Sequence, residues 1–199
     1  MPKTQRFNPP KDWLADHLDY NQYFIGFSQM LSFIALHFKV TKTPRPRTMI
    51  EIGSFMGEST QMFAASGIFD TIHTMDPFEG YEKFAVDHDL TWDQIKNEYK
   101  QNTRNFDNIQ LHEAYSYDMV SEFQNGSIDF IYIDGAHDYQ SVLQDLEYYL
   151  PKVKKNGLMG GHDYNKFYEP YEDVIRAVNQ VVGQPNKIFP DTSWLKVIR

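Results

Sequence analysis

Residues 128–150 read IDFIYIDGAHDYQSVLQDLEYYL and join an apolar run to an amphipathic pattern through a short polar turn. The run at 128–133 is rich in Ile, Phe and Tyr, which is typical of a buried β-strand. Beyond the turn, apolar residues recur at three- and four-residue steps and predict a helix, its face formed by Val142, Leu143, Leu146, Leu150 and Val153. A strand followed directly by a helix indicates an α/β domain with a parallel sheet.

The same alternation extends on both sides of this stretch. Further strands are predicted at 48–53, 70–76, 108–114 and 157–163, and further helices at 58–66, 92–99, 116–123 and 170–182. Two short strands, 186–190 and 193–198, end the pattern with a turn short enough for a hairpin. We therefore expect a mostly parallel sheet, covered by helices on both faces, with an antiparallel hairpin at one edge.

The N-terminal segment has a different pattern. Residues 23–38 place apolar side chains at helical spacing, and the prolines of TPRPR (43–47) end the helix; the stripe consists of Phe24, Phe27, Met30, Leu31, Ile34, Ala35 and Phe38. We expect two parts, an N-terminal helical cap at 1–45 and a main domain at 46–199. The aromatic helix of the cap is also a candidate surface for homo-oligomer formation.

Composition narrows the classes of function. Lys and Arg number 19 and Asp and Glu 27, so the formal net charge is −8, and there are no cysteines. An acidic chain with one small basic cluster (39–47) is a poor nucleic-acid binder. The apolar stretch at 23–38 is short for a membrane span and carries polar residues at helical spacing. We expect a cytoplasmic protein that binds neither nucleic acid nor membrane.

Four residues that could bind a ligand or take part in catalysis stand at predicted strand ends: Gly53, Asp76, Asp134 and Asp163. Ligands of such sheets bind beyond the carboxyl ends of the strands. The loop EIGSFMGEST (51–60) has the glycines of a turn into a helix, but Phe55 breaks the G-x-G-x-x-G spacing of dinucleotide-binding proteins. A plain strand–helix turn explains these glycines equally well.

Taken together, EIGSFMGEST, TMDPF, DFIYIDGAHDYQSVLQDLEYYL and GLMGGHDY resemble the class I S-adenosylmethionine-dependent methyltransferases. The pattern is most similar to the metal-dependent O-methyltransferases of macrolide and aminocoumarin sugar tailoring, and it covers residues 47–199. The resemblance implies a Rossmann-like, doubly wound sheet of seven strands. It also implies S-adenosylmethionine as cofactor and a small-molecule acceptor, a sugar or glycoside, as partner.

The resemblance also implies roles for individual residues. The methionine part of the cofactor would lie against the first loop, whose matching residues are Glu51, Gly53, Ser54 and Gly57. Asp76 would accept hydrogen bonds from the ribose, and Ser116 and Tyr117 would contact the adenine. Asp134 would lie beside the cofactor as well as in a metal site.

The metal site implied by the resemblance consists of Asp134, His162 and Asp163, although His162 stands where the family has an acid or an amide. Two carboxylates on neighbouring strands suit Mg²⁺ or Mn²⁺. His137, three residues after Asp134, is a candidate general base. Alternatively, Asp134 is a capping or turn residue and His137 only marks the start of a helix.

The sequence thus predicts an O-methyltransferase that acts on a small molecule. Two alternatives stay open: a methyltransferase-like module that binds without turnover, and, less favoured because of Phe55, a nicotinamide-dependent oxidoreductase. The aromatic and acidic loop at 77–90 is a candidate lid, in which Tyr81 and His88 are candidate substrate contacts.

Overall fold

The structure is a computed structural model that describes residues 20–80, 90–165 and 172–199. The candidate lid residues Tyr81 and His88 lie outside the described residues, as does the first part of the predicted N-terminal cap.

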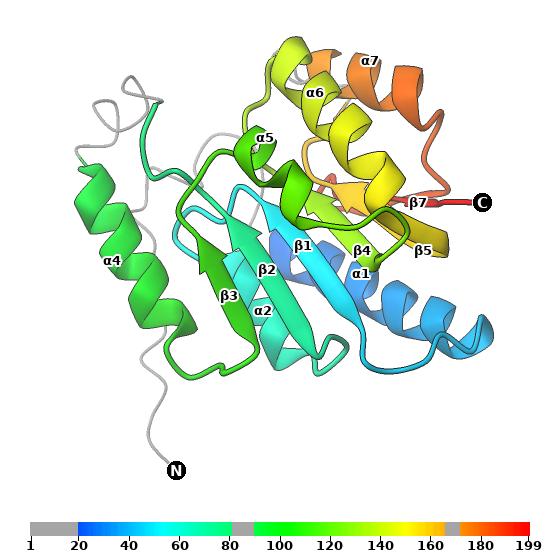
Figure 1. Cartoon of the computed structure of the whole chain (residues 1–199), viewed down its shortest axis with the longest axis horizontal. Coiled ribbons are helices and arrows are strands. Elements are labelled where there is room, and N and C mark those ends of the chain that lie inside the picture. Colours follow the sequence, from blue (N-terminus) through cyan, green and yellow to red (C-terminus); the bar gives the residue numbers. More distant parts are fainter. Residues whose placement is uncertain (1–19, 81–89, 166–171) are drawn as a thin grey trace.

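One sheet of seven strands forms the centre of the domain (Figure 1). Its strands are β1 (Thr48–Ile52), β2 (Thr71–Met75), β3 (Ile109–His112), β4 (Ile128–Ile133), β5 (Val153–Gly161), β6 (Lys187–Ile188) and β7 (Trp194–Val197). The order is β3-β2-β1-β4-β5-β7-β6. The first five strands are parallel, whereas β7 is antiparallel to both β5 and β6. The predicted parallel sheet with an antiparallel C-terminal edge is therefore confirmed.

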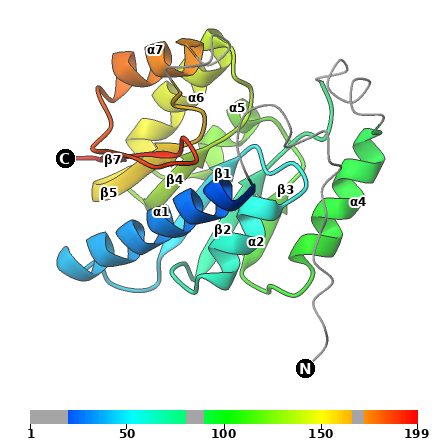
Figure 2. The ribbon, with the colours of Figure 1, turned by 180° about the vertical axis from the view of Figure 1, so that it is seen from behind.

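Helices cover both faces of the sheet (Figures 1 and 2). On one face lie α5 (Ser116–Met119), α6 (Tyr139–Tyr149) and α7 (Glu172–Val181), together with short 3₁₀ turns at Val120–Glu122 and Leu150–Lys152. On the other face lie α1 (Tyr20–Val40) and α2 (Glu58–Ala65). Helix α4 (Trp92–Thr103) lies beyond β3 and contacts α2. The arrangement is the doubly wound α/β fold that the sequence predicted.

Helix α1 packs into the core of the domain. Phe27, Met30, Ile34 and Phe38 are fully buried and share an apolar cluster with sheet residues that include Phe130, Tyr132, Leu158 and Leu195. The buried stripe is narrower than the sequence suggested, because Phe24 and Ala35 are exposed. Among the described helices, α1 is also long and apolar enough to cross a membrane by length and composition, but core helices meet the same criterion.

Two glycines let β5 lie close to both of its neighbours. A Cβ on Gly160 would lie 2.6 Å from the carbonyl oxygen of Trp194 in β7, and one on Gly161 would lie 2.3 Å from that of Ile133 in β4. Larger residues would push these strands apart. The two glycines therefore let the end of β5 lie tightly between β4 and β7, directly before His162 and Asp163.

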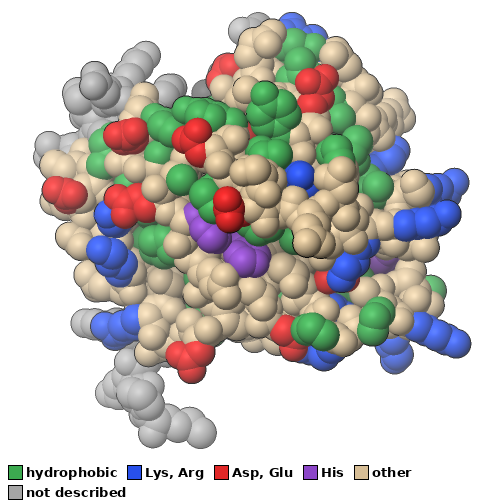
Figure 3. All heavy atoms as spheres, in the orientation of Figure 1, with side chains coloured by type: hydrophobic (Ala, Val, Ile, Leu, Met, Phe, Trp, Pro, Cys, Tyr) green, Lys and Arg blue, Asp and Glu red, His purple; other side chains and the backbone are tan. Residues whose placement is uncertain are grey.

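The surface carries its charges in a scattered arrangement. On the face shown in Figure 3, Lys and Arg side chains lie mainly toward the edges and are separated by polar and apolar surface. Among the described residues, this face has no continuous basic surface of the kind that binds a phosphate backbone.

Candidate active site

The loop after β1 has an unusual backbone. Gly53, Phe55 and Gly57 all have positive φ angles, of 82°, 43° and 78°. Glycine adopts such angles freely, whereas a bulky residue such as Phe55 pays a conformational cost. Gly53 is required for a second reason, because a Cβ there would lie 2.1 Å from the carbonyl oxygen of Asp134. The β1 loop and the end of β4 are therefore in direct backbone contact.

Asp76 follows β2 directly and holds this loop in place. Its Oδ2 accepts a hydrogen bond from the backbone N–H of Phe55 and its Oδ1 one from that of Phe78, both at 2.8 Å. Burial raises the pKa of Asp76, and the backbone hydrogen bonds oppose that rise. Each carboxylate oxygen has a further lone pair, so Asp76 can still accept hydrogen bonds from a ligand.

Ser54 and Glu51 differ sharply in how their polar groups are satisfied. The hydroxyl of Ser54 is buried and has no hydrogen-bond partner among the described residues. Glu51 is fully buried and accepts hydrogen bonds from the hydroxyls of Ser59 and Thr60, so it ties the first turn of α2 to β1. The hydroxyl of Ser54 thus has hydrogen-bonding capacity left, whereas both carboxylate oxygens of Glu51 already accept hydrogen bonds within the protein.

Ser116 and Tyr117 begin α5, at the same edge of the sheet. The hydroxyl of Ser116 donates to the buried carboxylate of Asp145 in α6. Tyr117 is 47% exposed and stacks on Tyr115, with ring centroids 5.1 Å apart. The stacked rings of Tyr117 and Tyr115 therefore form a partly exposed aromatic surface where adenine contacts were expected. The adenine contacts of Ser116 and Tyr117 stay a prediction.

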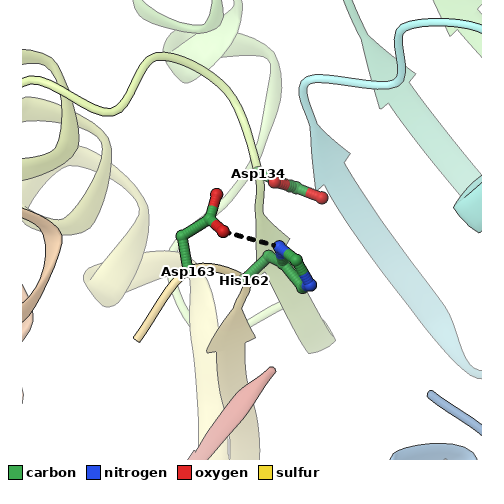
Figure 4. Close-up of side chains that lie close together, drawn as sticks. All are labelled: Asp134, His162 and Asp163. Atoms are coloured by element: carbon green, nitrogen blue, oxygen red, sulfur yellow. Dashed lines mark ion pairs between the residues drawn. The ribbon is translucent and has the colours of Figure 1, made fainter. Parts of the chain in front are cut away.

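At the ends of β4 and β5, Asp134, His162 and Asp163 point toward one another (Figure 4). Their ligand atoms all lie within 4.8 Å of one another, and Nδ1 of His162 lies 3.0 Å from Oδ1 of Asp163. The expectation that these strands are neighbours is confirmed by their parallel pairing. Two carboxylates and an imidazole at this spacing form a donor set that can hold a divalent cation.

Asp163 is held under constraint. It is buried, and its backbone has a φ angle of 61°, which a non-glycine residue rarely adopts. Burial by itself raises the pKa of Asp163. His162 and His137 outweigh the effect of burial and hold the pKa of this carboxyl well below its usual range. The protein thus keeps this carboxylate charged in a largely buried position.

His137 joins the same cluster from the loop after β4. Its Nε2 lies 2.9 Å from Oδ2 of Asp163 and 4.0 Å from Oδ1 of Asp134, and the ring is 45% exposed. Burial lowers the pKa of His137, but the carboxylates of Asp134 and Asp163 raise it to about 10. In this geometry the ring is an imidazolium at neutral pH, which cannot accept a proton.

Two neighbours of the cluster were not predicted. Tyr23 of α1 lies edge-on to His162, with ring centroids 6.0 Å apart. Asp191, before β7, is fully buried. Burial lowers the pKa of His162, but Asp163, Asp134 and, to a smaller extent, Asp191 raise it to about 9. No sequence pattern predicts that either Tyr23 or Asp191 lies near the cluster, because both reach it only through the packing of α1 and the final hairpin.

Comparison with known proteins agrees with this fold. The family Methyltransf_24, described as a methyltransferase domain, matches residues 50–164. The chain is 31% identical over 156 residues to uncharacterized protein R132 of Acanthamoeba polyphaga mimivirus, which covers 72% of this chain and 63% of that protein. A second relative, uncharacterized protein y4gI of Sinorhizobium fredii, is 24% identical over 60% of this chain and 13% of its own length. The chain thus spans less than two thirds of either relative.

Solved structures share the architecture at low sequence identity. A provisionally assigned O-methyltransferase from Klebsiella pneumoniae has a TM-score of 0.57 at 14% identity, covering 98% of this chain and 93% of its own. The O-methyltransferase from Bacillus cereus in complex with SAH has a TM-score of 0.54 at 16% identity, covering 93% and 84%. Spermidine synthase from Thermotoga maritima has a TM-score of 0.56 at 15% identity, covering 86% and 58%. Likeness at this level concerns the fold alone, and these proteins differ in activity.

The family match includes the β1 loop, Asp76, Asp134 and the His162–Asp163 pair, and it covers more than half of the chain. The chain therefore belongs to the methyltransferase-domain family Methyltransf_24.

Proposed function

We propose that the protein is an O-methyltransferase that transfers the methyl group of S-adenosylmethionine to a hydroxyl of a small molecule. The observation that carries the proposal is the contact between the two strand-end sites, since Gly53 lies against the backbone of Asp134. Methyl transfer requires donor and acceptor to be held in line at short range. Family membership supports the same reaction class over nicotinamide chemistry.

The donor would be held by the groups around the β1 loop. Asp76 would accept the ribose hydroxyls, and the buried, unpartnered hydroxyl of Ser54 is placed to bond the methionine part. Tyr117 would lie against the adenine. Buried polar groups rarely lack a partner, so the orphaned Ser54 hydroxyl supports a ligand at this loop.

The acceptor would lie at the cluster of Asp134, His162 and Asp163, whose donor atoms fit a divalent ion. When bound, such an ion supplies Lewis-acid chemistry that lowers the pKa of a hydroxyl. His137, at the exposed side of the cluster, is placed to orient the acceptor. In the ion-free site the paired ring is protonated at neutral pH, so its proposed role as base requires that its pairing with Asp163 is lost, as it would be if this carboxylate bound the ion instead. A sugar or glycoside as acceptor rests on the resemblance of the strand-end motifs to sugar O-methyltransferases.

Calorimetry with S-adenosylmethionine and S-adenosylhomocysteine tests the donor half of the proposal. We expect both to bind, and binding of neither would overturn it. Release of S-adenosylhomocysteine with a panel of sugars, glycosides and other alcohols tests the acceptor half. Binding without transfer across the panel would instead favour a module that binds without turnover, and a rise in nicotinamide fluorescence on mixing would favour an oxidoreductase.

A further inference from the structure

The donor set at the ends of β4 and β5 contains nitrogen as well as oxygen. Asp134 and Asp163 supply carboxylate oxygens, and His162 supplies an imidazole nitrogen. Carboxylate and water ligands suit Mg²⁺, whereas imidazole favours later first-row ions such as Fe²⁺, Co²⁺, Ni²⁺ and Zn²⁺. The choice of ion therefore depends on whether His162 binds it.

The geometry of His162 fits direct ligation. Its Nδ1 lies 3.0 Å from Oδ1 of Asp163, and its side chain is only 13% exposed. Adjacent ligands of an octahedral ion with bonds of about 2.1 Å lie about 3.0 Å apart, so the two atoms already have the spacing of a ligand pair. Figure 4 shows the ring directed toward the two carboxylates.

His162 also has little freedom to turn away from the cluster. The ring lies against Tyr23 on α1, and its Nε2 is buried without a hydrogen-bond partner among the described residues. Backbone contacts fix its attachment point, since the His162 N–H donates to the carbonyl of Ile133 at 3.1 Å. A ring packed in this way keeps its Nδ1 beside the two carboxylates, where it can serve as a ligand.

We propose that His162 makes this site selective for a late first-row divalent ion, such as Fe²⁺, Co²⁺, Ni²⁺ or Zn²⁺, over Mg²⁺. The inference deepens the proposed function and rests on it only in assuming that the enzyme uses the bound ion. Ion selectivity itself depends on the ligands Asp134, His162 and Asp163, whatever reaction takes place at the site.

Co²⁺ binding, followed by its visible absorption, and competition by Mg²⁺ test the proposal in the full chain. We expect Co²⁺ to bind at least about tenfold more tightly than Mg²⁺, because imidazole suits the later first-row ions, whereas Mg²⁺ prefers oxygen ligands. In His162→Asp the preference should fall by at least about tenfold, the lower end of what loss of even an outer-shell partner costs. Mg²⁺ binding should stay equal or become tighter, whereas misfolding would weaken the binding of both ions.

His162→Asn is the second variant, because a further buried carboxylate beside Asp134 and Asp163 could prevent folding. Two control variants remove histidines elsewhere. His37→Gln removes a ring that bonds to the carbonyl of Asn156 at the far end of α1. His73→Gln breaks the pair in which Nδ1 of His73 lies 3.1 Å from Nε2 of His112, another place where Co²⁺ could bind. Both control variants should keep the wild-type preference.

A preference unchanged in both folded His162 variants would overturn the inference, as would Mg²⁺ binding more tightly than Co²⁺ to the wild type. Calorimetry with S-adenosylhomocysteine on the same samples separates the two proposals. Cofactor binding with unchanged selectivity would leave the methyltransferase proposal standing and refute the role of His162. The expected selectivity without cofactor binding would do the reverse.

Discussion

Nε2 of His137 lies 2.9 Å from Oδ2 of Asp163, so a half-exposed ring from the loop after β4 pairs with a buried carboxylate at the end of β5. Because the two residues are far apart in the sequence, this ion pair could not be predicted from the sequence. The ring of His137 therefore places a positive charge at the exposed side of the Asp134–His162–Asp163 cluster when no other cation is bound.

The charge of His137 can be measured directly. Because Asp134 and Asp163 raise its pKa to about 10, the ion-free protein should keep this ring protonated through pH 8. NMR titration of the imidazole nitrogens would show this. Asp163→Asn should move the pKa back toward the ordinary value of about 6.5, because one of the two carboxylates is lost. A midpoint near 6.5 in the wild type would contradict the pairing.

Asp76 should anchor the ribose of the cofactor. Loss of hydrogen bonds to a charged group costs about 1.5–3 kcal/mol, so Asp76→Ala should weaken S-adenosylhomocysteine binding roughly 10- to 150-fold. Calorimetry gives the affinity, and a melting curve shows whether the variant is folded, since Asp76 also orders the loop through the N–H groups of Phe55 and Phe78. Wild-type affinity in a folded variant would remove Asp76 from the site.

Glu51 should make stability fall as pH rises. Burial raises its pKa from 4.5 to about 7, against the hydrogen bonds from Ser59 and Thr60. Between these values the folded state holds a proton that the unfolded chain has released, so the free energy of unfolding decreases with rising pH, by up to about 3 kcal/mol.

Glu51→Gln removes this titration and leaves the shape nearly unchanged. Urea unfolding at pH 5, 6, 7 and 8 should therefore show a flatter profile for the variant. Glu58 and Asp145, whose pKa values burial also raises, to about 7 and about 6, titrate in both proteins and cancel in the comparison. Parallel profiles would show that Glu51 is charged in the folded state throughout.

Asp129 and Lys154 should stabilise the opposite end of the sheet. Asp129 is 1% exposed, both of its oxygens lie 2.9 Å from Nζ of Lys154, and Oδ2 accepts from the N–H of Thr48. Lys154→Met should cost about 2–4 kcal/mol in urea unfolding, because it leaves a buried carboxylate without its cation. The double variant with Asp129→Asn should recover part of this loss; no recovery would mean that the charges are not coupled.

Gly26 should tolerate no side chain. A Cβ there would lie 2.3 Å from Oδ1 and 2.5 Å from the backbone nitrogen of Asp191, so Gly26→Ala must displace α1 from the loop before β7. We expect a loss of about 1–3 kcal/mol in unfolding free energy. Ser28→Ala, on the exposed side of the same helix, is the matched control and should change little. Equal stability of both variants would show that α1 does not approach Asp191 so closely.

The strand ends could be predicted from sequence because an apolar run and the polar residue after it are both local features. Asp76, Asp134 and Asp163 are found at the expected edge of the sheet for this reason. Side-chain partners could not be predicted, since they depend on packing between distant segments. The internal hydrogen bonds of Glu51 and the approach of Tyr23 to His162 are of this kind.

The position of α1 also bears on the order of events during synthesis. The helix leaves the ribosome before any strand, yet its buried residues Phe27 and Ile34 share their cluster with Phe130, Leu158 and Leu195. Earlier segments cover part of the stripe, since Phe27 also packs on Phe63 of α2, but the stripe is not fully covered until β4, β5 and finally β7 have been made. Until β7 has emerged, part of this hydrophobic helix is therefore exposed in the nascent chain, and exposed apolar surface of this kind favours aggregation in partly folded chains.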